Sequence, residues 1–225
     1  MIDDIELGAQ LREIIILAEA AGIPVDAVSR RELEGQSQTK RSQGVLAVVP
    51  DPRYHSPEAF VTAANRKGES ALIVMLDGVQ DPHNLGAIAR TADAAGAHGL
   101  IIPERRAVGI TPGAVSASAG ALEHVRVARV VNLNRAIEGL KEAGVLVVGL
   151  DADGEIGYTK ADFTGPVVIV VGSEGKGLSR LVRENCDQIV SIPMAGKLSS
   201  LNVSVSAGIV LYEVLRQRNA KRSAG

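Results

Sequence analysis

The segment Ile192–Ser206 gathers the side chains most able to bind a ligand. It leads from an apolar strand into an apolar helix. Four polar side chains stand within two turns of the helix start: Ser199, Ser200, Asn202 and Ser204. A helix start needs only one side-chain oxygen that accepts a backbone N–H. Because four such groups exceed that need, we expect Ser200 and Asn202 to face a ligand, whereas Ser204 fits ordinary helix packing.

A second candidate, Leu76–Thr91, runs from the end of an apolar strand through a turn into a helix. Ligands bind at this edge of an open α/β sheet. Asn84 stands where the helix cap is expected, and Gly86 and Arg90 share one helix face because they are four residues apart. Glycine weakens a helix, so we expect a chain segment or a ligand to approach closely at Gly86, with Arg90 beside it. The alternative for Arg90 is an ordinary surface position.

A third candidate is the glycine-rich turn Gly172–Leu178, which follows an apolar strand and precedes a helix. Glycines in such a turn allow backbone amides to point at a ligand. The spacing matches neither the Walker phosphate loop nor the dinucleotide-binding fingerprint. Glu174 would repel a phosphate, so the turn indicates a cationic or hydroxyl-bearing ligand instead.

These segments lie within a regular alternation of strands and helices that begins at Ala71. The expected strands are Ala71–Leu76, Gly99–Ile102, Val125–Val131, Val145–Leu150, Val167–Val171 and Gln188–Ile192. The expected helices are Leu85–Ala95, a segment around Pro112–Ala119, Leu133–Ala143, Leu178–Asn185 and Leu201–Gln217. Several strands are continuous runs of Val, Ile and Leu, which is typical of strands covered on both faces. The pattern therefore predicts an α/β fold with a parallel sheet wrapped by helices.

The chain before Ala71 predicts a smaller part. Residues 1–50 are expected to form a small α/β domain with strands at Ile23–Val28 and Gly44–Val49, the second one buried, and with Ser29 capping a helix. Residues 51–70 are rich in breakers and are expected to be a linker with a short helix near Pro57 to Asn65. Residues 71–225 are expected to form the main domain.

Composition excludes several classes of protein. The net charge of −2 means that any basic surface is local. With no Trp, two Phe and three Tyr, stacking platforms for bases are scarce, so an RNA would be held mainly through its phosphates, with an affinity that falls as salt rises. The single Cys186 excludes an internal disulfide and fits a reducing cytoplasm. No apolar run reaches the ~18 residues of a membrane span, and the histidines lack metal-ligand spacing.

Taken together, the three motifs resemble the SpoU (TrmH-like) branch of the SPOUT RNA methyltransferases. The first is Asp81-Pro82-x-Asn84-x-Gly86-x-x-x-Arg90, and the second is Val171-Gly172-Ser173-Glu174-Gly175-x-Gly177-Leu178. The third is Ile192-Pro193-Met194 with Ser200-Leu201-Asn202-Val203-Ser204. The domain order is similar to the subgroup that methylates a guanosine ribose in 23S ribosomal RNA. Compared with that subgroup, we expect the unit of residues 1–50 to lack an opening strand and helix, which would make it either truncated or divergent.

The resemblance implies 2'-O-methylation of RNA with S-adenosylmethionine as cofactor, a deep trefoil knot in the C-terminal part, and a homodimer whose site lies near the subunit interface. The cofactor residues it implies are Gly172, Ile192, Met194, Gly196 and Leu201. The catalytic residues it implies are Asn84, Arg90, Glu174, Ser200 and Asn202. Arg90 would hold a substrate phosphate and assist deprotonation of the ribose hydroxyl, although an arginine side chain stays charged.

Two other functions remain open from the sequence. One is methylation of a guanosine in transfer RNA rather than ribosomal RNA. The other is a non-catalytic RNA-binding protein of the same fold, which the joint presence of Arg90, Glu174 and Asn202 disfavours. An enzyme acting on nucleotide phosphates, suggested by the glycine turn alone, is disfavoured by Glu174 and by the missing Walker pattern.

Overall fold

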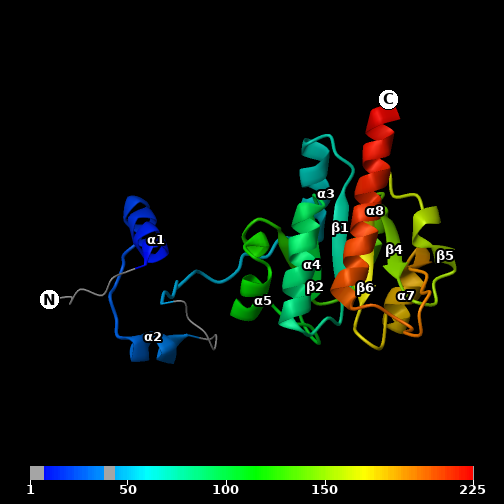
Figure 1. Cartoon of the computed structure of the whole chain (residues 1–225). Helices are drawn as coiled ribbons and strands as arrows, with labels where there is room; N and C mark the ends of the chain where they lie inside the picture. The colour runs from blue at the N-terminus through cyan, green and yellow to red at the C-terminus, as the bar shows by residue number, and fades with distance from the viewer. Residues whose placement is uncertain (1–7, 38–43, 225) are drawn as a thin grey trace. The chain divides into compact units, whose positions relative to one another are not determined.

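The computed structural model describes residues 8–37 and 44–224. The chain divides into two compact units, Met1–Asp51 and Pro52–Gly225 (Figure 1). The larger unit contains all three motifs.

The described residues of the smaller unit form the helices α1 (Ala9–Ala20) and α2 (Arg30–Gln36). The predicted cap is confirmed, because the Ser29 hydroxyl accepts from the Glu32 N–H at 3.3 Å and the Glu32 carboxylate accepts from the Ser29 N–H at 2.9 Å.

The two predicted strands of this unit, Ile23–Val28 and Gly44–Val49, are wrong. Neither segment forms a strand, and the side chain of Val48 is 92% exposed. A strand persists only when a neighbour completes its hydrogen-bond ladder. Neither segment finds such a neighbour in the described part of the unit, so apolar composition alone misled the interpretation.

The larger unit is built on a seven-stranded parallel sheet in the order β3-β2-β1-β6-β4-β7-β5. Its strands are β1 (Leu72–Asp77), β2 (Gly99–Pro103), β3 (Val127–Val130), β4 (Leu146–Leu150), β5 (Ile156–Gly157), β6 (Val167–Gly172) and β7 (Gln188–Ser191). The predicted parallel sheet is confirmed. The two-residue β5 was not predicted, because it is too short to show a pattern.

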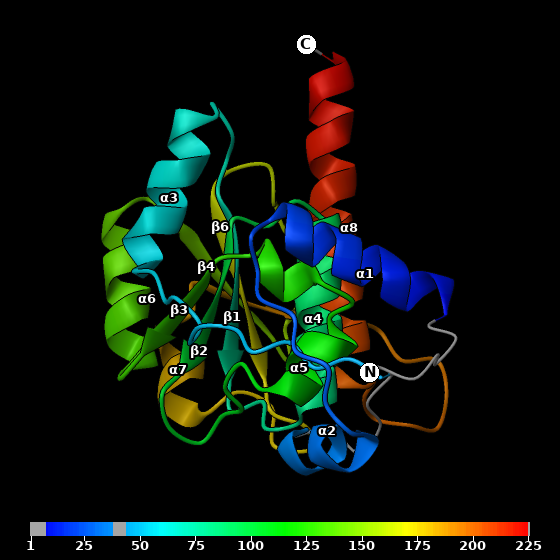
Figure 2. The ribbon, with the colours of Figure 1, turned by 90° about the vertical axis from the view of Figure 1, so that its left-hand side faces the viewer.

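Helices cover both faces of this sheet, as Figure 2 shows. One face carries α4 (Pro82–Ala94), α5 (Pro112–Ala117) and α8 (Val203–Ala224), and the other carries α3 (Pro57–Arg66), α6 (Leu133–Glu142) and α7 (Arg180–Asn185). Two short 3-10 helices lie at Ala121–Glu123 and Tyr158–Lys160. Strand β6 lies between the layers: Val167, Ile169 and Val171 pack on the α4/α8 side, and Val168 and Val170 pack on the other.

The segment expected to be a linker contributes to the core of the larger unit. It contains the predicted short helix as α3, in which Phe60 and Ala64 are fully buried. The Phe60 ring packs over the backbone of Gly99, where an added Cβ would lie 2.6 Å from it. Burial of a large aromatic side chain lowers the free energy of the folded state, and the scattered charges of this segment do not outweigh that gain. This part of the segment therefore packs onto the sheet.

Helix α8 is held at its C-terminal half by one arginine. The Arg218 guanidinium donates to four backbone carbonyls, those of Ser70 (2.8 Å), Ala71 (2.9 Å), Phe163 (3.2 Å) and Gly165 (2.7 Å). These carbonyls lie just before β1 and β6. Arg218 thus ties α8 to the edge of the sheet at which the strands begin.

We expect Arg218→Met to lower the free energy of unfolding by about 2–4 kcal/mol, because four carbonyls lose a charged donor while the apolar stem remains. Urea denaturation measures the change. Arg222→Met, four residues along the same helix and exposed, is the matched control and should be near neutral. Equal effects of the two substitutions would contradict the anchoring role.

His98 is a second anchor at the same edge of the sheet. Its Nδ1 accepts from the Leu72 N–H at 3.1 Å, so Nε2 carries the proton that faces Glu69 Oε2 at 3.1 Å. Burial lowers the pKa of His98, and the opposing effect of Glu69 is smaller. The folded protein therefore favours the neutral imidazole.

This lowered pKa predicts a pH-dependent stability. A free histidine titrates near about pH 6.5, so below that pH the unfolded chain binds a proton that the folded protein resists. The contribution is fully present above about pH 6.5 and is lost as the pH falls towards the lowered folded pKa. His98→Asn, which keeps an acceptor for Leu72, should remove this part of the pH dependence in urea titrations. His124→Asn, at an exposed position, should leave it unchanged.

Candidate active site

The three motifs lie in loops at the edge where the parallel strands end, which we call the carboxyl edge. The first joins β1 to α4, the second joins β6 to α7, and the third joins β7 to α8. Strands β1 and β6 are neighbours, and β4 separates β6 from β7. The sheet thus places all three loops at one edge, as expected for ligand binding in an open α/β sheet.

The prediction that Asn84 caps α4 is wrong. Asp81 is the cap, because its Oδ1 accepts from the His83 N–H at 3.0 Å, and Pro82 opens the first turn. Proline suits that position since its missing N–H would have no partner there. Asn84 lies within the first turn with 6% of its surface exposed, so its amide is available for other contacts.

Asn84, Glu174 and Asn202 form a hydrogen-bonded cluster, the Asn–Glu–Asn cluster, with one residue from each motif. The Asn84 amide donates to Glu174 Oε1 at 2.9 Å. The Asn202 amide donates to the same oxygen at 2.8 Å and to Asn84 Oδ1 at 3.0 Å. Bonds to an ionised carboxylate are stronger than those between neutral groups. The cluster therefore joins three loops that are far apart in the sequence.

Asn202 also caps helix α8. Its Oδ1 accepts from the Ser204 N–H at 2.9 Å and from the Ser204 hydroxyl at 2.6 Å. Every group that contacts Asn202 Oδ1 is a donor, and every group that contacts Asn202 Nδ2 is an acceptor. These partners determine the orientation of the Asn202 side-chain amide. The expectation that Asn202 does more than cap its helix is supported, and Ser204 contributes by holding the Asn202 carbonyl.

The glycine turn that carries Glu174 is closed on itself. Ser173 and Gly177 exchange two backbone hydrogen bonds of 3.0 Å each. A Cβ on Gly172 would lie 2.2 Å from the Gly177 carbonyl carbon, and Gly177 has a φ of 63°. Glycine satisfies both constraints, so these two positions allow the closed turn that carries Glu174.

At Gly86 the close approach is made by a helix. An added Cβ would lie 2.5 Å from Ala117 Cβ and 2.6 Å from the Ala114 carbonyl oxygen, both on α5. The close approach expected at this glycine is thus confirmed as the approach of a chain segment.

Two aspartates that the sequence interpretation missed support the same edge. Asp77, at the end of β1, accepts from the Ser179 N–H at 2.6 Å and so holds the start of α7. Asp151, just after β4, pairs with Arg183 at 3.0 Å and accepts from the Leu178 N–H at 3.5 Å. Their signal in the sequence is an acidic residue at the end of a buried apolar strand.

Arg90 and Ser200 are not part of the Asn–Glu–Asn cluster. Arg90 is exposed and makes no hydrogen bond or ion pair with any residue that the structure describes. It follows Asn84 by six residues, which places it on a different face of α4 and about 9 Å further along the axis. Ser200 is likewise exposed and without a partner in the described ranges. The structure therefore brings together three of the five expected catalytic residues.

The expected cofactor residues lie in the segments that carry the second and third motifs. Gly172 ends β6, and Ile192, half-buried, follows β7. Met194, Gly196 and Leu201 are exposed in the irregular segment that leads to α8. Among the described residues, the backbone groups from 194 to 201 make no hydrogen bond with one another or with the rest of the chain. They are free to bind the edges of a flat polar ring.

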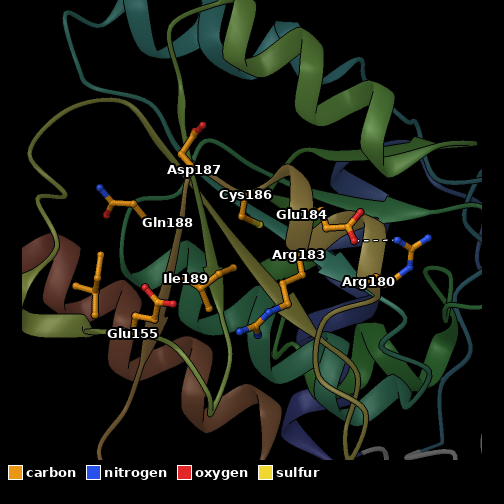
Figure 3. A pocket seen from close by; sticks show the side chains of 9 residues that line it. Glu155, Arg180, Arg183, Glu184, Cys186, Asp187, Gln188 and Ile189 are labelled. Carbon is orange, nitrogen blue, oxygen red and sulfur yellow. Dashed lines mark hydrogen bonds and ion pairs between the residues drawn. The ribbon is translucent and has the colours of Figure 1, made fainter.

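A pocket of about 530 Å³ lies elsewhere, between α7 and the β5–β7 edge of the sheet (Figure 3). Its lining includes Ile156, Ile189 and Cys186, and it includes none of the three motif residues of the cluster. Arg180 at its rim is neutralised by Glu184 at 2.8 Å. Burial raises the pKa of Cys186 to about 12, so this thiol stays protonated and unreactive. The cluster, rather than this pocket, is therefore the candidate active site.

No group of three or more His, Cys, Asp or Glu side chains in the described ranges could hold a metal ion. In the same ranges, none of the helices combines the length and apolar character needed to cross a membrane.

Comparison with known proteins agrees with this geometry. Residues 71–212 match the model of the SpoU rRNA Methylase family, and residues 3–55 match the model described as RNA 2'-O ribose methyltransferase substrate binding. The chain belongs to the SpoU rRNA methylase family. The family resemblance is thereby confirmed, and the protein is an RNA methyltransferase.

Individual relatives cover most of the chain. A putative TrmH family tRNA/rRNA methyltransferase, YacO of Bacillus subtilis, is 49% identical over 93% of this chain and 84% of its own length. The SpoU methyltransferase AviRb from Streptomyces viridochromogenes, solved in complex with AdoMet, has a TM-score of 0.75 and 30% identity over 96% of this chain and 80% of its own. An AdoMet-bound rRNA methyltransferase from Sinorhizobium meliloti has a TM-score of 0.73 and 30% identity over 92% of this chain and 77% of its own.

The cluster predicts a specific coupling between Asn202 and Glu174. Asn202→Asp keeps the oxygen that caps α8 but sets a second carboxylate against Glu174 Oε1, so we expect a loss of about 1–2 kcal/mol in unfolding free energy. In the Glu174→Gln background an amide can meet the new carboxylate, and most of the loss should disappear. Urea denaturation of the four proteins gives the coupling energy. An equal cost of Asn202→Asp in both backgrounds would show that the two side chains do not interact.

Proposed function

We propose that this protein transfers a methyl group from S-adenosylmethionine to the 2' oxygen of a ribose, that of a guanosine in 23S ribosomal RNA. The observation that carries the proposal is the Asn–Glu–Asn cluster, which assembles all three motifs into one site. The proposal includes a trefoil knot in the C-terminal part and action in the cytoplasm, both implied by the family resemblance.

The residues present fit this cofactor. The glycine turn leaves no room for a side chain at Gly172, which allows a close approach of backbone to a ligand. The unpaired backbone groups from 194 to 201 can bind an adenine edge and the amino-acid end of the cofactor. Glu174 places a carboxylate at the site, which suits a positively charged sulfonium. When bound, S-adenosylmethionine supplies an electrophilic methyl group and is left as a neutral thioether.

The side chains supply orientation and charge. A ribose hydroxyl is a poor nucleophile at neutral pH, so the oxygen must be stabilised as its proton leaves. The two asparagine amides hold Glu174 Oε1 by hydrogen bonds. Oε2 is left free to accept a hydrogen bond from the ribose hydroxyl. Arg90 stays charged, holds the adjacent phosphate and stabilises the oxygen as its proton passes to solvent. Ser200 completes the pocket around the substrate.

A homodimer would bring Arg90 to the cluster of a second protomer. Within one chain Arg90 is outside the Asn–Glu–Asn cluster, as its position on α4 shows. Helix α8 exposes an apolar stripe in which Val205 (50% exposed), Ile209 and Tyr212 (52% exposed) follow at helical spacing. Exposed apolar stripes of this kind commonly mark contact surfaces. We therefore include a homodimer with α8 near the interface in the proposal.

Ribosomal RNA is favoured over transfer RNA by the smaller unit. Residues 3–55 match a substrate-binding domain, and the rRNA methyltransferase from Sinorhizobium meliloti aligns over both units. Transfer RNA is the second candidate, because relatives are named for both RNAs.

The test combines cofactor binding with methyl transfer. Calorimetry should detect S-adenosylmethionine binding, and labelled methyl should pass to deproteinised 23S ribosomal RNA. The phosphodiester bond that follows the labelled nucleotide should resist alkaline cleavage, because a methylated 2' oxygen cannot attack it. Transfer to tRNA alone would replace ribosomal RNA as the substrate. Absence of heat with the cofactor would overturn the proposal.

For Arg90→Ala we expect cofactor affinity close to that of the parent protein and a methyl-transfer rate lower by about 10²–10³-fold, the usual cost of removing one charge-stabilising group. Arg135→Ala, an exposed arginine on the opposite sheet face, is the control. Near-normal transfer by the Arg90 variant would refute its role.

A mixing experiment tests whether Arg90 acts across the dimer. Arg90→Ala and Asn202→Ala should each transfer the methyl group far more slowly than the parent protein when tested alone. In a mixed dimer, one site combines the intact cluster of one protomer with the intact Arg90 of the other, so activity should partly return. If the mixture stays inactive while mixed dimers form, Arg90 acts within its own chain.

A further inference from the structure

The loop between β2 and α5 carries two adjacent arginines, Arg105 and Arg106, in an unusual conformation. Arg106 has a φ of 59°, and Ala119 is the only other non-glycine residue with positive φ in the part of the chain that the structure describes. Glycine adopts this conformation freely, whereas a side chain makes it costly. An arginine that adopts a strained backbone conformation, where glycine would be unstrained, indicates a functional role for its guanidinium group.

This loop packs directly against the candidate active site. The Val108 N–H donates to the Val79 carbonyl at 3.0 Å, which joins the loop to the first motif. A Cβ built on Gly78 would lie 3.9 Å from the Arg106 carbonyl oxygen and 3.5 Å from Ser173 Cβ. Ser173 immediately precedes Glu174. Gly78 thus lies between the backbone of Arg106 and the turn that carries Glu174.

Both arginines are exposed and unpaired. No carboxylate of the described chain lies within ion-pair distance of either one. Glu104 precedes them, but the contact it makes here is through its backbone. Its N–H donates to the Val130 carbonyl at 2.8 Å. By contrast, Arg183 pairs with Asp151 at 3.0 Å.

Two lysines in neighbouring loops are also without partners. Lys176, in the loop after β6, and Lys197, in the segment after β7, are exposed and unpaired among the described residues. Unpaired arginines bind phosphate groups well, because their N–H donors form a planar fork.

We propose that Arg105 and Arg106 bind the phosphodiester backbone of the RNA next to the nucleotide in the site, and so position the substrate. The inference rests on the proposed function and adds the residues that hold the RNA on the β2 side. The two guanidinium groups contact phosphates and not the reacting atoms, so they are positioning residues. This use of the guanidinium would offset the cost of the left-handed backbone at Arg106.

The test uses the full chain with Arg105→Ala, Arg106→Gly and the double variant. Filter binding to deproteinised 23S ribosomal RNA is measured over a series of KCl concentrations. Each substitution should weaken binding by about threefold to tenfold and reduce the slope of log affinity against log salt by about 1. In methyl-transfer assays KM should rise while kcat changes little.

Two comparisons separate this role from a structural one. Arg106→Gly should keep or raise the thermal midpoint, since glycine relieves the left-handed conformation, and still lose RNA affinity. Arg66→Ala removes an exposed arginine at the C-terminal end of α3, close to the start of β1 and so at the opposite edge of the sheet. It should leave the affinity and the salt slope unchanged.

The outcomes for this inference and for the proposed function are distinct. If the parent protein methylates RNA and the arginine variants keep its KM and salt slope, the inference is overturned and the proposed function stands. If the parent protein neither binds S-adenosylmethionine nor methylates RNA, the proposed function fails. A loss of RNA affinity in the arginine variants would in that case still support the RNA contact.

Discussion

The shared carboxylate oxygen of Glu174 is the contact on which the site depends. Two asparagine amides from different loops converge on this one atom. Asn84 is almost fully buried, and a buried amide without partners is costly, so these hydrogen bonds favour the arrangement in which the loops meet. The cluster therefore stabilises the arrangement of the three motifs and is also part of the candidate site.

Helix α8 links the cluster to the rest of the larger unit. Asn202 fixes its first turn at the carboxyl edge, and Arg218 fixes its last turns at the edge where the strands begin. Gln217 adds to this second anchor, since it accepts from the Phe163 N–H at 2.9 Å and donates to the Ala161 carbonyl at 2.9 Å. A helix held at both ends transmits little motion to its N-terminus. Asn202 is thus presented to the cluster by a rigid element, as precise chemistry requires.

Polar and charged side chains serve two purposes in the larger unit. Where the strands begin, backbone carbonyls bind Arg218, and Leu72 and Glu69 bind His98, so these groups stabilise the fold. Beside the candidate site, Arg105 and Arg106 have no partner among the described residues. Unpaired charges contribute little to folding, whereas they attract a polyanion strongly at low salt. These two arginines are therefore available to an RNA.

The sequence alone determined the features that depend on local order. Runs of Val and Ile predicted the buried strands of the parallel sheet, and Ser29 with Glu32 formed the expected helix cap. The motif order identified the family. Local apolar composition failed at Gly44–Val49, because a strand also needs a neighbour that no local pattern supplies.

Only the tertiary structure decided which polar side chains meet. Asn84 resembled a helix cap in the sequence, yet Asp81 took that role and released Asn84 for Glu174. The contacts of Arg218 and Asp151 join residues far apart in the chain, and a sequence read in order carries no measure of such distances. Spacing along a strand or helix is set by the backbone, whereas contact between loops is set by how the whole sheet brings its strand ends together.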